Sequence, residues 1–317
     1  PDALMGLIHQ HDIGMMQDTP ATWRMLLSGA SHAWPDRSEP IKALCGGEAL
    51  PSALAQALLE KPLSLMNVYG PTETTIWSTT YTLGHGAANV KGVKTTGGNS
   101  ATNVAIGLPV ANTQLYLLDQ NLSPVPTGAQ GTLYIGGEGL ARGYSGRPDL
   151  TAHVFVPNPF ADDGSRLYNT GDRARINVDG NLEYLGRDDG QIKLHGYRIE
   201  LPEIEACLSA VSLKGENKSD DNDQGRIESV AVVVHQEQLV AYWVGDAACV
   251  TNAEARMREA LVSHLPEYMR PRYFVHLDQL PLSAAGKVDR KTLASKALVL
   301  DELLSDRSGQ RAASNAL

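Results

Sequence analysis

A change of pattern at the charged turn Arg187-Asp188-Asp189-Gly190 constrains the fold of this chain more than any other feature. Upstream of the turn, segments with helical spacing of apolar residues are followed by short β-rich runs. Downstream come a short strand, a helix over Pro202 to Ala210, strands at Ser229 to His235 and Leu239 to Val244, and a helix over Asn252 to Leu265. About a hundred residues suffice for a compact domain of this kind. The pattern therefore predicts two unequal domains that meet in this turn.

The upstream part has two kinds of pattern. Residues 20–31 and 51–60 each start with Pro and space Leu, Met and Ala residues helically, and Pro suits a first helical turn. These two predicted helices flank a strand at Ile41 to Leu44. From Ala105 to Ile135, short alternating runs are separated by Pro and Gly, and Asn177 to Gly180 suits a tight hairpin turn. The second pattern is typical of antiparallel sheet.

The composition excludes several classes of function. The 317 residues hold 27 Lys and Arg against 36 Asp and Glu, a formal net charge of -9, which argues against a general binder of nucleic acid or anionic membranes. No apolar run is long enough to span a bilayer. Cys45, Cys207 and Cys249 lack the spacing of a metal site, and Pro1 to Gly6 shows no targeting peptide. We therefore expect free thiols and a cytoplasmic location.

Three turns carry residue types suited to chemistry. Asn67 to Thr75 combines an aromatic ring, a Gly-Pro turn, hydroxyls and a carboxylate, which together could stack a base, bond a phosphate and hold Mg²⁺. Asp172 follows a Gly turn and could accept both hydroxyls of a ribose. Lys287 lies in a flexible turn that presents one cation. Taken alone, each turn is explained as well or better by an ordinary surface loop, so both interpretations stay open.

In order along the chain, the motifs resemble those of adenylation domains of non-ribosomal peptide synthetases, within the adenylate-forming superfamily, from about residue 15 to residue 292. The motifs that carry the resemblance are Gly46-Gly47-Glu48-Ala49-Leu50-Pro51, Asn67 to Thr75, Gly131 to Gly137 with Ala141-Arg142-Gly143-Tyr144, Tyr168 to Asp172, Gly186 to Glu200, and the Lys287 loop. Two positions depart from the family pattern: Pro202 stands where the family usually has Gly, and Ala285 where it often has Asn.

The resemblance implies a fold and a division of the chain. It implies a mixed α/β and α+β class, in which residues 1–188 form the C-terminal portion of a large core subdomain, a sheet with helices followed by a small distorted β-barrel. Residues 189–297 would form a small mobile α+β cap, and residues 298–317 a linker or tail. The family's phosphate-gripping loop and the Asp that holds the substrate amine do not occur in this sequence. We expect both to precede residue 1, and we expect this N-terminally incomplete piece to be inactive alone.

The resemblance also implies an activity. An amino-acid carboxylate would attack the α-phosphate of ATP, releasing pyrophosphate and forming an aminoacyl adenylate. The phosphopantetheine thiol of a peptidyl carrier domain would then take the acyl group. The expected cofactors are ATP, Mg²⁺ and the carrier's phosphopantetheine, and the expected partners are the amino acid, the carrier domain and neighbouring synthetase domains. Two alternatives stay open: an acyl- or aryl-CoA ligase of the same superfamily, and a non-catalytic docking module.

Residue roles are implied position by position. By resemblance, Lys287 would offset the repulsion between carboxylate and phosphate, Thr72 would contact phosphate, and Glu73 would support Mg²⁺. The positions that would contact the nucleotide are Asn67 and Tyr69 beside the adenine, Asp172 at the ribose, and Tyr184 and Arg187. Asp189 would be the hinge about which the cap turns, bringing the face of Lys193 in for the second half-reaction.

The substrate pocket can be partly inferred in the same way. The family's specificity positions are matched by Gln17, Leu44, Gly46, Val68, Ile76 and Trp77. A Trp that closes a pocket removes the volume that a large substrate side chain needs, and no charged residue is present to pair with a charged one. The set resembles that of glycine-activating domains. We therefore expect a small neutral amino acid, with glycine favoured, while core packing remains the alternative explanation of Trp77.

Overall fold

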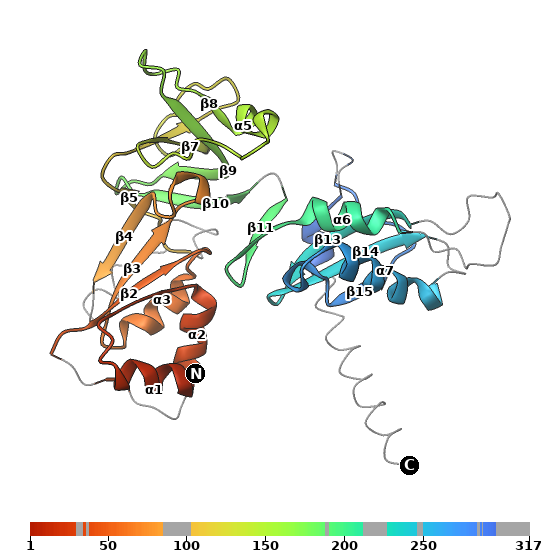
Figure 1. The fold of residues 1–317 in the computed structure, drawn as a ribbon, viewed down its shortest axis with the longest axis horizontal. Coiled ribbons are helices and arrows are strands. Elements are labelled where there is room, and N and C mark those ends of the chain that lie inside the picture. The colour runs from red at the N-terminus through yellow and green to blue at the C-terminus, as the bar shows by residue number, and fades with distance from the viewer. Residues whose placement is uncertain are drawn as a thin grey trace. The chain divides into compact units, whose positions relative to one another are not determined.

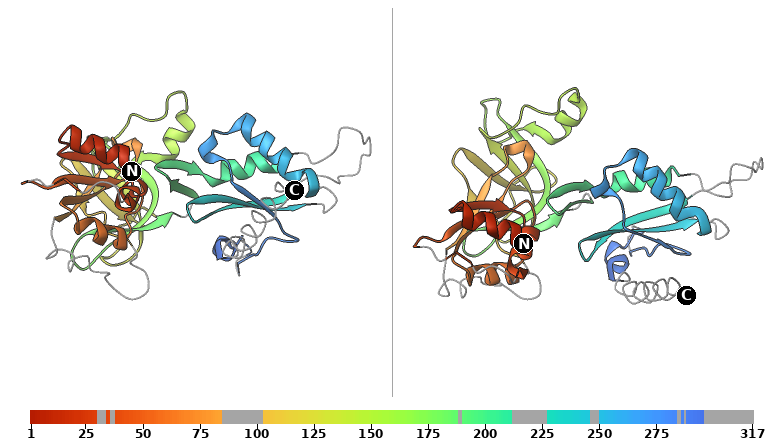
Figure 2. Two further views of the ribbon diagram at one scale, coloured as in Figure 1. Left: turned by 90° about the horizontal axis from the view of Figure 1, so that it is seen from below. Right: turned by 60° about the horizontal axis from the view of Figure 1, so that its bottom comes forward.

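The computed structural model describes residues 1–29, 34–35, 38–84, 103–187, 190–211, 227–245, 250–283, 286 and 288–295. The chain divides into two compact units, Pro1–Asp189 (unit 1) and Gly190–Leu317 (unit 2), which are drawn in Figures 1 and 2. Each unit has its own hydrophobic core. The mixed α/β and α+β class expected from the sequence is confirmed. The domain limits at 188 and 297, and the roles of core and cap, stay predictions.

Unit 1 begins with a mixed sheet of five strands, in the order β1-β2-β3-β4-β5. The strands are β1 (Met15–Asp18), β2 (Ile41–Gly46), β3 (Leu63–Tyr69), β4 (Thr79–Gly84) and β5 (Leu108–Pro109). β1, β2 and β3 are parallel, whereas β4 runs antiparallel to both β3 and β5. The carboxyl ends of the three parallel strands therefore lie at one edge, where ligands of such sheets usually bind.

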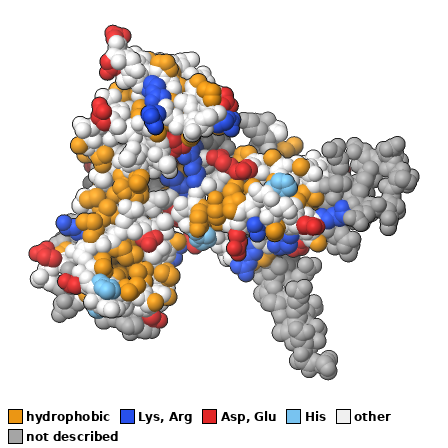
Figure 3. All heavy atoms as spheres, viewed as in Figure 1, with side chains coloured by type: hydrophobic (Ala, Val, Ile, Leu, Met, Phe, Trp, Pro, Cys, Tyr) orange, Lys and Arg blue, Asp and Glu red, His pale blue; other side chains and the backbone are white. Residues whose placement is uncertain are grey.

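Three helices share a hydrophobic core with this sheet. They are α1 (Asp2–Gln10), α2 (Pro20–Ser28) and α3 (Ser52–Leu59). Their apolar residues, including the fully buried Trp23 and Leu58, pack in one cluster with β2 and β3. Hydrophobic side chains also gather on the surface around these helices in Figure 3. Two such residues on α1 and α2, Leu7 and Met25, are exposed. The two helices predicted after Pro20 and Pro51, and the strand between them, are confirmed.

The rest of unit 1 is an antiparallel sheet in the order β10-β9-β7-β6, with β8 also paired to β9. The elements are β6 (Thr113–Leu118), β7 (Gly131–Gly137), α5 (Pro148–Val154), β8 (Phe155–Pro157), β9 (Arg166–Ile176) and β10 (Leu182–Arg187). The turn between β9 and β10 is fixed by Asn177, whose side-chain oxygen accepts the N–H groups of Asp179 and Asn181. The antiparallel sheet and its predicted hairpin are confirmed, with the expected small barrel present as an open half-barrel.

Unit 2 is an α+β unit. It contains a hairpin of β11 (Gln191–Leu194) and β12 (Tyr197–Glu200), then α6 (Leu201–Ser209), β13 (Ile227–His235), β14 (Gln238–Gly245), α7 (Val250–His264), η3 (Glu267–Met269) and β15 (Tyr273–His276). β14 lies between antiparallel β13 and parallel β15. One core joins α6 and α7 to this sheet, and a second cluster includes the fully buried Leu293. No helix in the described residues is long and apolar enough to cross a membrane.

Candidate active site

The loop after β3 folds tightly back on itself. β3 ends at Tyr69, and η1 (Thr72–Thr74) follows a Gly-Pro pair. A Cβ atom on Gly70 would lie 2.3 Å from the carbonyl oxygen of Ile76, so only glycine permits this approach. The N–H of Ser78 then donates to the carbonyl oxygen of Tyr69 at 2.8 Å. These contacts fix the loop at the C-terminal end of β3.

A buried carboxylate lies beside this loop. Asp172 on β9 is 2% exposed, and the hydroxyl of Tyr69 donates to its Oδ2 atom. A guanidinium nitrogen of Arg187, on β10, donates to Oδ1 at 2.8 Å. The backbone N–H of Asp172 donates to the hydroxyl oxygen of Thr170 at 2.9 Å. Residues that are 103 positions apart in the sequence are thus joined in one buried network.

The ring of Tyr69 belongs to the same network. It lies 6.3 Å from the ring of Tyr184, centroid to centroid, at an angle of 38°. Burial, and then the charge of Asp172, raise the pKa of Tyr69 well above its ordinary value. The phenol therefore stays protonated and acts as a donor to the carboxylate. Four of the five positions predicted to contact a nucleotide are brought together: Tyr69, Asp172, Tyr184 and Arg187.

Asn67, the fifth predicted nucleotide position, is held differently. Its side chain is 2% exposed and its amide donates to the carbonyl oxygen of Ala105 at 2.8 Å. This bond ties β3 to the segment that leads into β5. In this structure the amide of Asn67 supports the sheet.

Glu73, the predicted magnesium ligand, lies in η1 and is 7% exposed. The hydroxyl of Tyr144 donates to its Oε1 atom at 2.6 Å, and the N–H of Ala141 donates to its backbone carbonyl oxygen at 2.8 Å. The neighbouring Thr72 is exposed. Tyr144 belongs to one of the motifs that carry the resemblance, but the sequence implies no role for it. Its contact joins residues 71 positions apart, so only the fold reveals it.

Glu73 suits a magnesium ion that is held by one protein carboxylate together with substrate phosphate and water. The described residues contain no group of three His, Cys, Asp or Glu side chains that could hold a metal ion. Mg²⁺ is commonly bound by one or two carboxylates together with substrate phosphates and water. A single buried carboxylate beside an exposed threonine hydroxyl is compatible with that arrangement. The site does not resemble a metal cage built from protein ligands alone.

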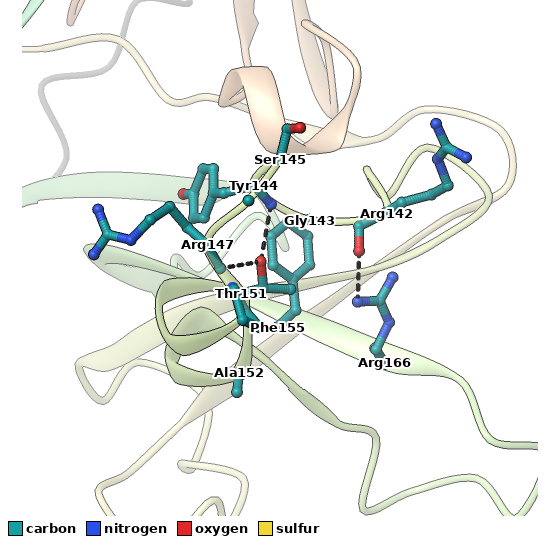
Figure 4. A pocket seen from close by; sticks show the side chains of 11 residues that line it. Arg142, Gly143, Tyr144, Ser145, Arg147, Thr151, Ala152, Phe155 and Arg166 are labelled. Carbon is teal, nitrogen blue, oxygen red and sulfur yellow. Dashed lines mark hydrogen bonds between the residues drawn. The ribbon is translucent and has the colours of Figure 1, made fainter.

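A groove that the sequence did not predict lies next to Tyr144. It has a volume of about 640 Å³ and lies around α5 (Figure 4). Its lining includes Arg142, Tyr144, Thr151, Phe155 and Arg166. The guanidinium of Arg166 donates to the carbonyl oxygens of Arg142 and Ala141 and lies 5.1 Å from the centre of the Phe155 ring. Arg166 therefore stabilises the loop that contains Ala141 and Arg142.

Most of the residues predicted to line a substrate pocket lie at or beyond the carboxyl ends of the parallel strands. Gln17 is aligned with Leu44 and Gly46 with Val68 in the sheet register. The indole N–H of Trp77 donates to the side-chain oxygen of Gln17 at 3.1 Å. A Cβ atom on residue 46 would lie 2.7 Å from the Trp77 ring. The indole therefore occupies the space above the end of β2.

The structure indicates no role for the other predicted site residues. Ile76 is 58% exposed and has a φ angle of 70°, which β-branched residues seldom adopt. Lys193 lies on β11 in unit 2, where it is aligned with Arg198 of β12. Lys287 and Asp189 lie outside the described residues, as does the predicted tail at 298–317.

Comparison with known proteins places this site in context. A family model described as AMP-binding enzyme matches residues 1–145. The chain is 46% identical over 298 residues to a dimodular nonribosomal peptide synthase of Bacillus subtilis (strain 168), covering 92% of the chain and 11% of that protein. It is 44% identical over 233 residues to malpibaldin synthetase of Mortierella alpina, covering 72% of the chain and 4% of that protein. The chain thus spans about a tenth or less of these curated relatives.

Solved structures agree with the sequence comparison. Holo-PA1221, an NRPS protein containing adenylation and PCP domains, superposes with a TM-score of 0.71 at 29% identity, covering 92% of this chain and 46% of that one. Holo-AB3403, a four-domain nonribosomal peptide synthetase bound to AMP and glycine, has a TM-score of 0.50 at 38% identity and covers 91% of this chain and 20% of that one.

Proposed function

The chain belongs to the adenylation domains of non-ribosomal peptide synthetases, within the AMP-binding enzymes, and on that premise we propose that it helps to activate an amino acid with ATP. The reaction would form an aminoacyl adenylate and pyrophosphate, and the acyl group would pass to the phosphopantetheine thiol of a carrier domain. The observation that carries this proposal is the buried network of Asp172, Tyr69 and Arg187 beside the Glu73 loop.

The network suits the sugar and base of a nucleotide. A carboxylate is an acceptor only, so Asp172 can accept hydrogen bonds from ribose hydroxyls but offers a phosphate no donor. Its bonds to Tyr69 and Arg187 fix the orientation of the carboxylate before any ligand arrives. The rings of Tyr69 and Tyr184 supply an aromatic surface at the same place. We assign these four residues to the nucleotide.

The triphosphate end is assigned to the loop after β3 and to the cap. Glu73 would hold Mg²⁺ and the exposed Thr72 would contact phosphate. Bound Mg²⁺ supplies positive charge that offsets the repulsion between phosphate and carboxylate. Lys287 would supply a second positive charge in the first half-reaction. Asp189 would act as the hinge, and Lys193 would face the site in the second half-reaction.

The substrate is proposed to be a small neutral amino acid, with glycine favoured. Support comes from the indole of Trp77, which is held by Gln17 and lies over Gly46. A larger substrate side chain would need the volume that this ring occupies. One structural neighbour, at 38% identity, was solved with AMP and glycine bound, which is a property of that protein. The proposal for this chain rests on the arrangement around Trp77.

The proposed partners are a peptidyl carrier domain and neighbouring synthetase domains, and the proposed location is the cytoplasm. The relative at 46% identity is dimodular, and two structural neighbours contain PCP domains beside the adenylation domain.

An acyl- or aryl-CoA ligase is less well supported, because that relative is named as a peptide synthase. Since this sequence lacks the family's phosphate-gripping loop, we propose that these residues alone are inactive.

Pyrophosphate exchange by the full-length protein that contains this sequence tests the proposal. Exchange should depend on an added amino acid, and glycine should give the strongest signal in a panel of amino acids. Lys287→Ala should lower the rate of adenylate formation by a factor on the order of 10² to 10³, because one charge that stabilises the transition state is lost. Transfer from preformed adenylate to the carrier should change much less. Lys291→Ala, at an exposed lysine four positions further along the sequence, is the matched control.

Other outcomes would select the alternatives. Exchange that depends on a fatty or aryl acid would identify an acyl ligase. A full-length protein that binds neither ATP nor any amino acid would be a docking module. Equal losses in both half-reactions for Lys287→Ala would contradict its assigned role.

A further inference from the structure

Two segments of unit 1 are fastened together around Glu73. One is the loop with η1, and the other is the stretch from Gly137 to Tyr144 that leaves β7. Ala141 donates to the carbonyl oxygen of Glu73, the hydroxyl of Thr75 donates to the carbonyl oxygen of Gly139 at 2.7 Å, and Tyr144 bonds the Glu73 carboxylate. Of these three links, only the one from Tyr144 reaches the carboxylate.

Tyr144 is itself held by residues that follow it in the sequence. The backbone N–H of Tyr144 donates to the hydroxyl oxygen of Thr151 at 2.9 Å, and that hydroxyl donates to the carbonyl oxygen of Arg147 at 2.9 Å (Figure 4). Its ring meets the ring of Phe155 edge to face, with centroids 6.0 Å apart. A side chain fixed at its backbone and along its ring has little freedom at its hydroxyl. The donor is therefore held towards Oε1 of Glu73 by its contacts with Thr151 of α5 and with Phe155.

The direction of this hydrogen bond is settled by chemistry. An ionised carboxylate can only accept, so the phenol must donate. A hydrogen bond to a carboxylate is shorter and stronger than one between neutral groups, in keeping with the 2.6 Å separation.

We propose that Tyr144 is a positioning residue for magnesium, which holds the Glu73 carboxylate in the orientation in which it binds the metal. The inference rests on the proposed function, because it takes Glu73 as the magnesium ligand. Hydrogen bonds from outer residues orient metal-binding side chains, and losing one commonly lowers metal affinity about 10- to 100-fold. Tyr144 acts through Glu73 and need not touch the metal or the nucleotide.

Tyr144→Phe in the full-length protein tests the inference, because it keeps the ring against Phe155 and removes only the hydroxyl. Two metal readouts should move together. The Mg²⁺ concentration that gives half-maximal exchange, and the dissociation constant of Mn²⁺ measured by electron paramagnetic resonance with nucleotide bound, should each rise about 10- to 100-fold. Saturating Mg²⁺ should restore most of the rate. The affinity for AMP without divalent metal should stay unchanged, because Asp172 and Tyr69 are untouched.

Thr75→Val is the matched control, since it breaks a different link between the same two segments and leaves the carboxylate alone. Its metal dependence should equal that of wild type. If both variants weaken metal binding equally, Tyr144 only joins the two segments. If Tyr144→Phe leaves metal binding unchanged, the positioning role is refuted.

Failure of the inference and failure of the proposed function have separate signatures. If Glu73→Gln leaves Mn²⁺ binding unchanged, the inference is wrong even where amino-acid-dependent exchange persists. If wild type shows no exchange with any amino acid, the proposed function is wrong. In that case a higher dissociation constant for Mn²⁺ in both Glu73→Gln and Tyr144→Phe would still support the inference.

Discussion

At the scale of single residues, Cys45 on β2 illustrates what burial does to a reactive group. Its side chain has no exposed surface, and burial, followed by the charges of Glu48 and Asp18, raises the pKa of its thiol from 9.0 to about 12. The thiolate is the nucleophilic form, so this cysteine is protected twice, by inaccessibility and by protonation. Cys207 is only partly buried and is the more accessible of the two free thiols in the described residues.

A pH dependence of stability follows from the Cys45 thiol. Above pH 9 the unfolded thiol loses its proton, while the folded thiol keeps its proton up to about pH 12. The unfolded state then binds fewer protons, so the free energy of unfolding falls as pH rises, by about 1.4 kcal/mol per pH unit in this window. Urea unfolding at pH 8 and pH 10.5 should show wild type losing about 2 kcal/mol more than Cys45→Ala. Identical pH dependence in both proteins would contradict the raised pKa.

The sequence predicts residue identities at the site better than it predicts their partners. Motifs point to Asp172, Tyr69 and Arg187, yet nothing local indicates that the first accepts hydrogen bonds from the other two. Asn67 is expected beside a base, but the fold gives its amide a backbone carbonyl to bond. The sequence does not reveal Tyr144 as a site residue, because its contact with Glu73 depends on how β7 and α5 fold against the loop. Such contacts are set by tertiary packing, which no spacing rule encodes.

At the scale of elements, the turn between β13 and β14 departs from the chemistry of tight hairpins. Gln236 and Glu237 have φ angles of 46° and 60°, a left-handed conformation that favours Gly and Asn. Glu237→Gly should raise the free energy of unfolding by about 1 kcal/mol relative to Glu237→Ala, because an L-residue is strained in this conformation. Comparing Gly with Ala cancels any interaction of the Glu side chain. Urea unfolding provides the measurement, and an Ala variant as stable as the Gly variant would show that the turn is unstrained.

Elements with long, clear patterns are predicted well, and short ones are not. The helices after Pro20, Pro51 and Pro202 carry both a spacing signal and a start signal, and each begins within one residue of its Pro. α5 and β8 have seven and three residues, too few to show a period. β8 is instead held by pairing with β9 and by the Arg166 guanidinium, which lies over the Phe155 ring. The sequence therefore indicates the layers of the fold but not the small elements that shape its site.

At the scale of the whole molecule, each unit has its own hydrophobic core, so we expect each to fold by itself. Unit 2 contains a three-stranded sheet with α6 and α7 in one core and a second cluster around Tyr242 and Leu293. A polypeptide of residues 190–317 should therefore unfold in urea in one cooperative transition, with a stability of about 5 kcal/mol or more. Circular dichroism and fluorescence should report the same midpoint.

Two substitutions in that polypeptide serve as controls. Leu208 has no exposed surface, so Leu208→Asp would bury an unpaired charge and should abolish the transition. Val262 is 59% exposed, so Val262→Asp should leave the transition nearly unchanged. A gradual, probe-dependent loss of structure in the unsubstituted polypeptide would mean that unit 2 needs unit 1 to fold.

The first sheet has one further consequence, for how the molecule behaves in solution. Within the described residues, β1 is paired with β2 along one side only, and Met15 on this strand is 59% exposed. Backbone groups along the other side of a terminal strand are a template on which a second polypeptide can add, and nearby apolar surface on α1 and α2 strengthens such an association. Covering that edge in the full-length protein would therefore lower its tendency to aggregate.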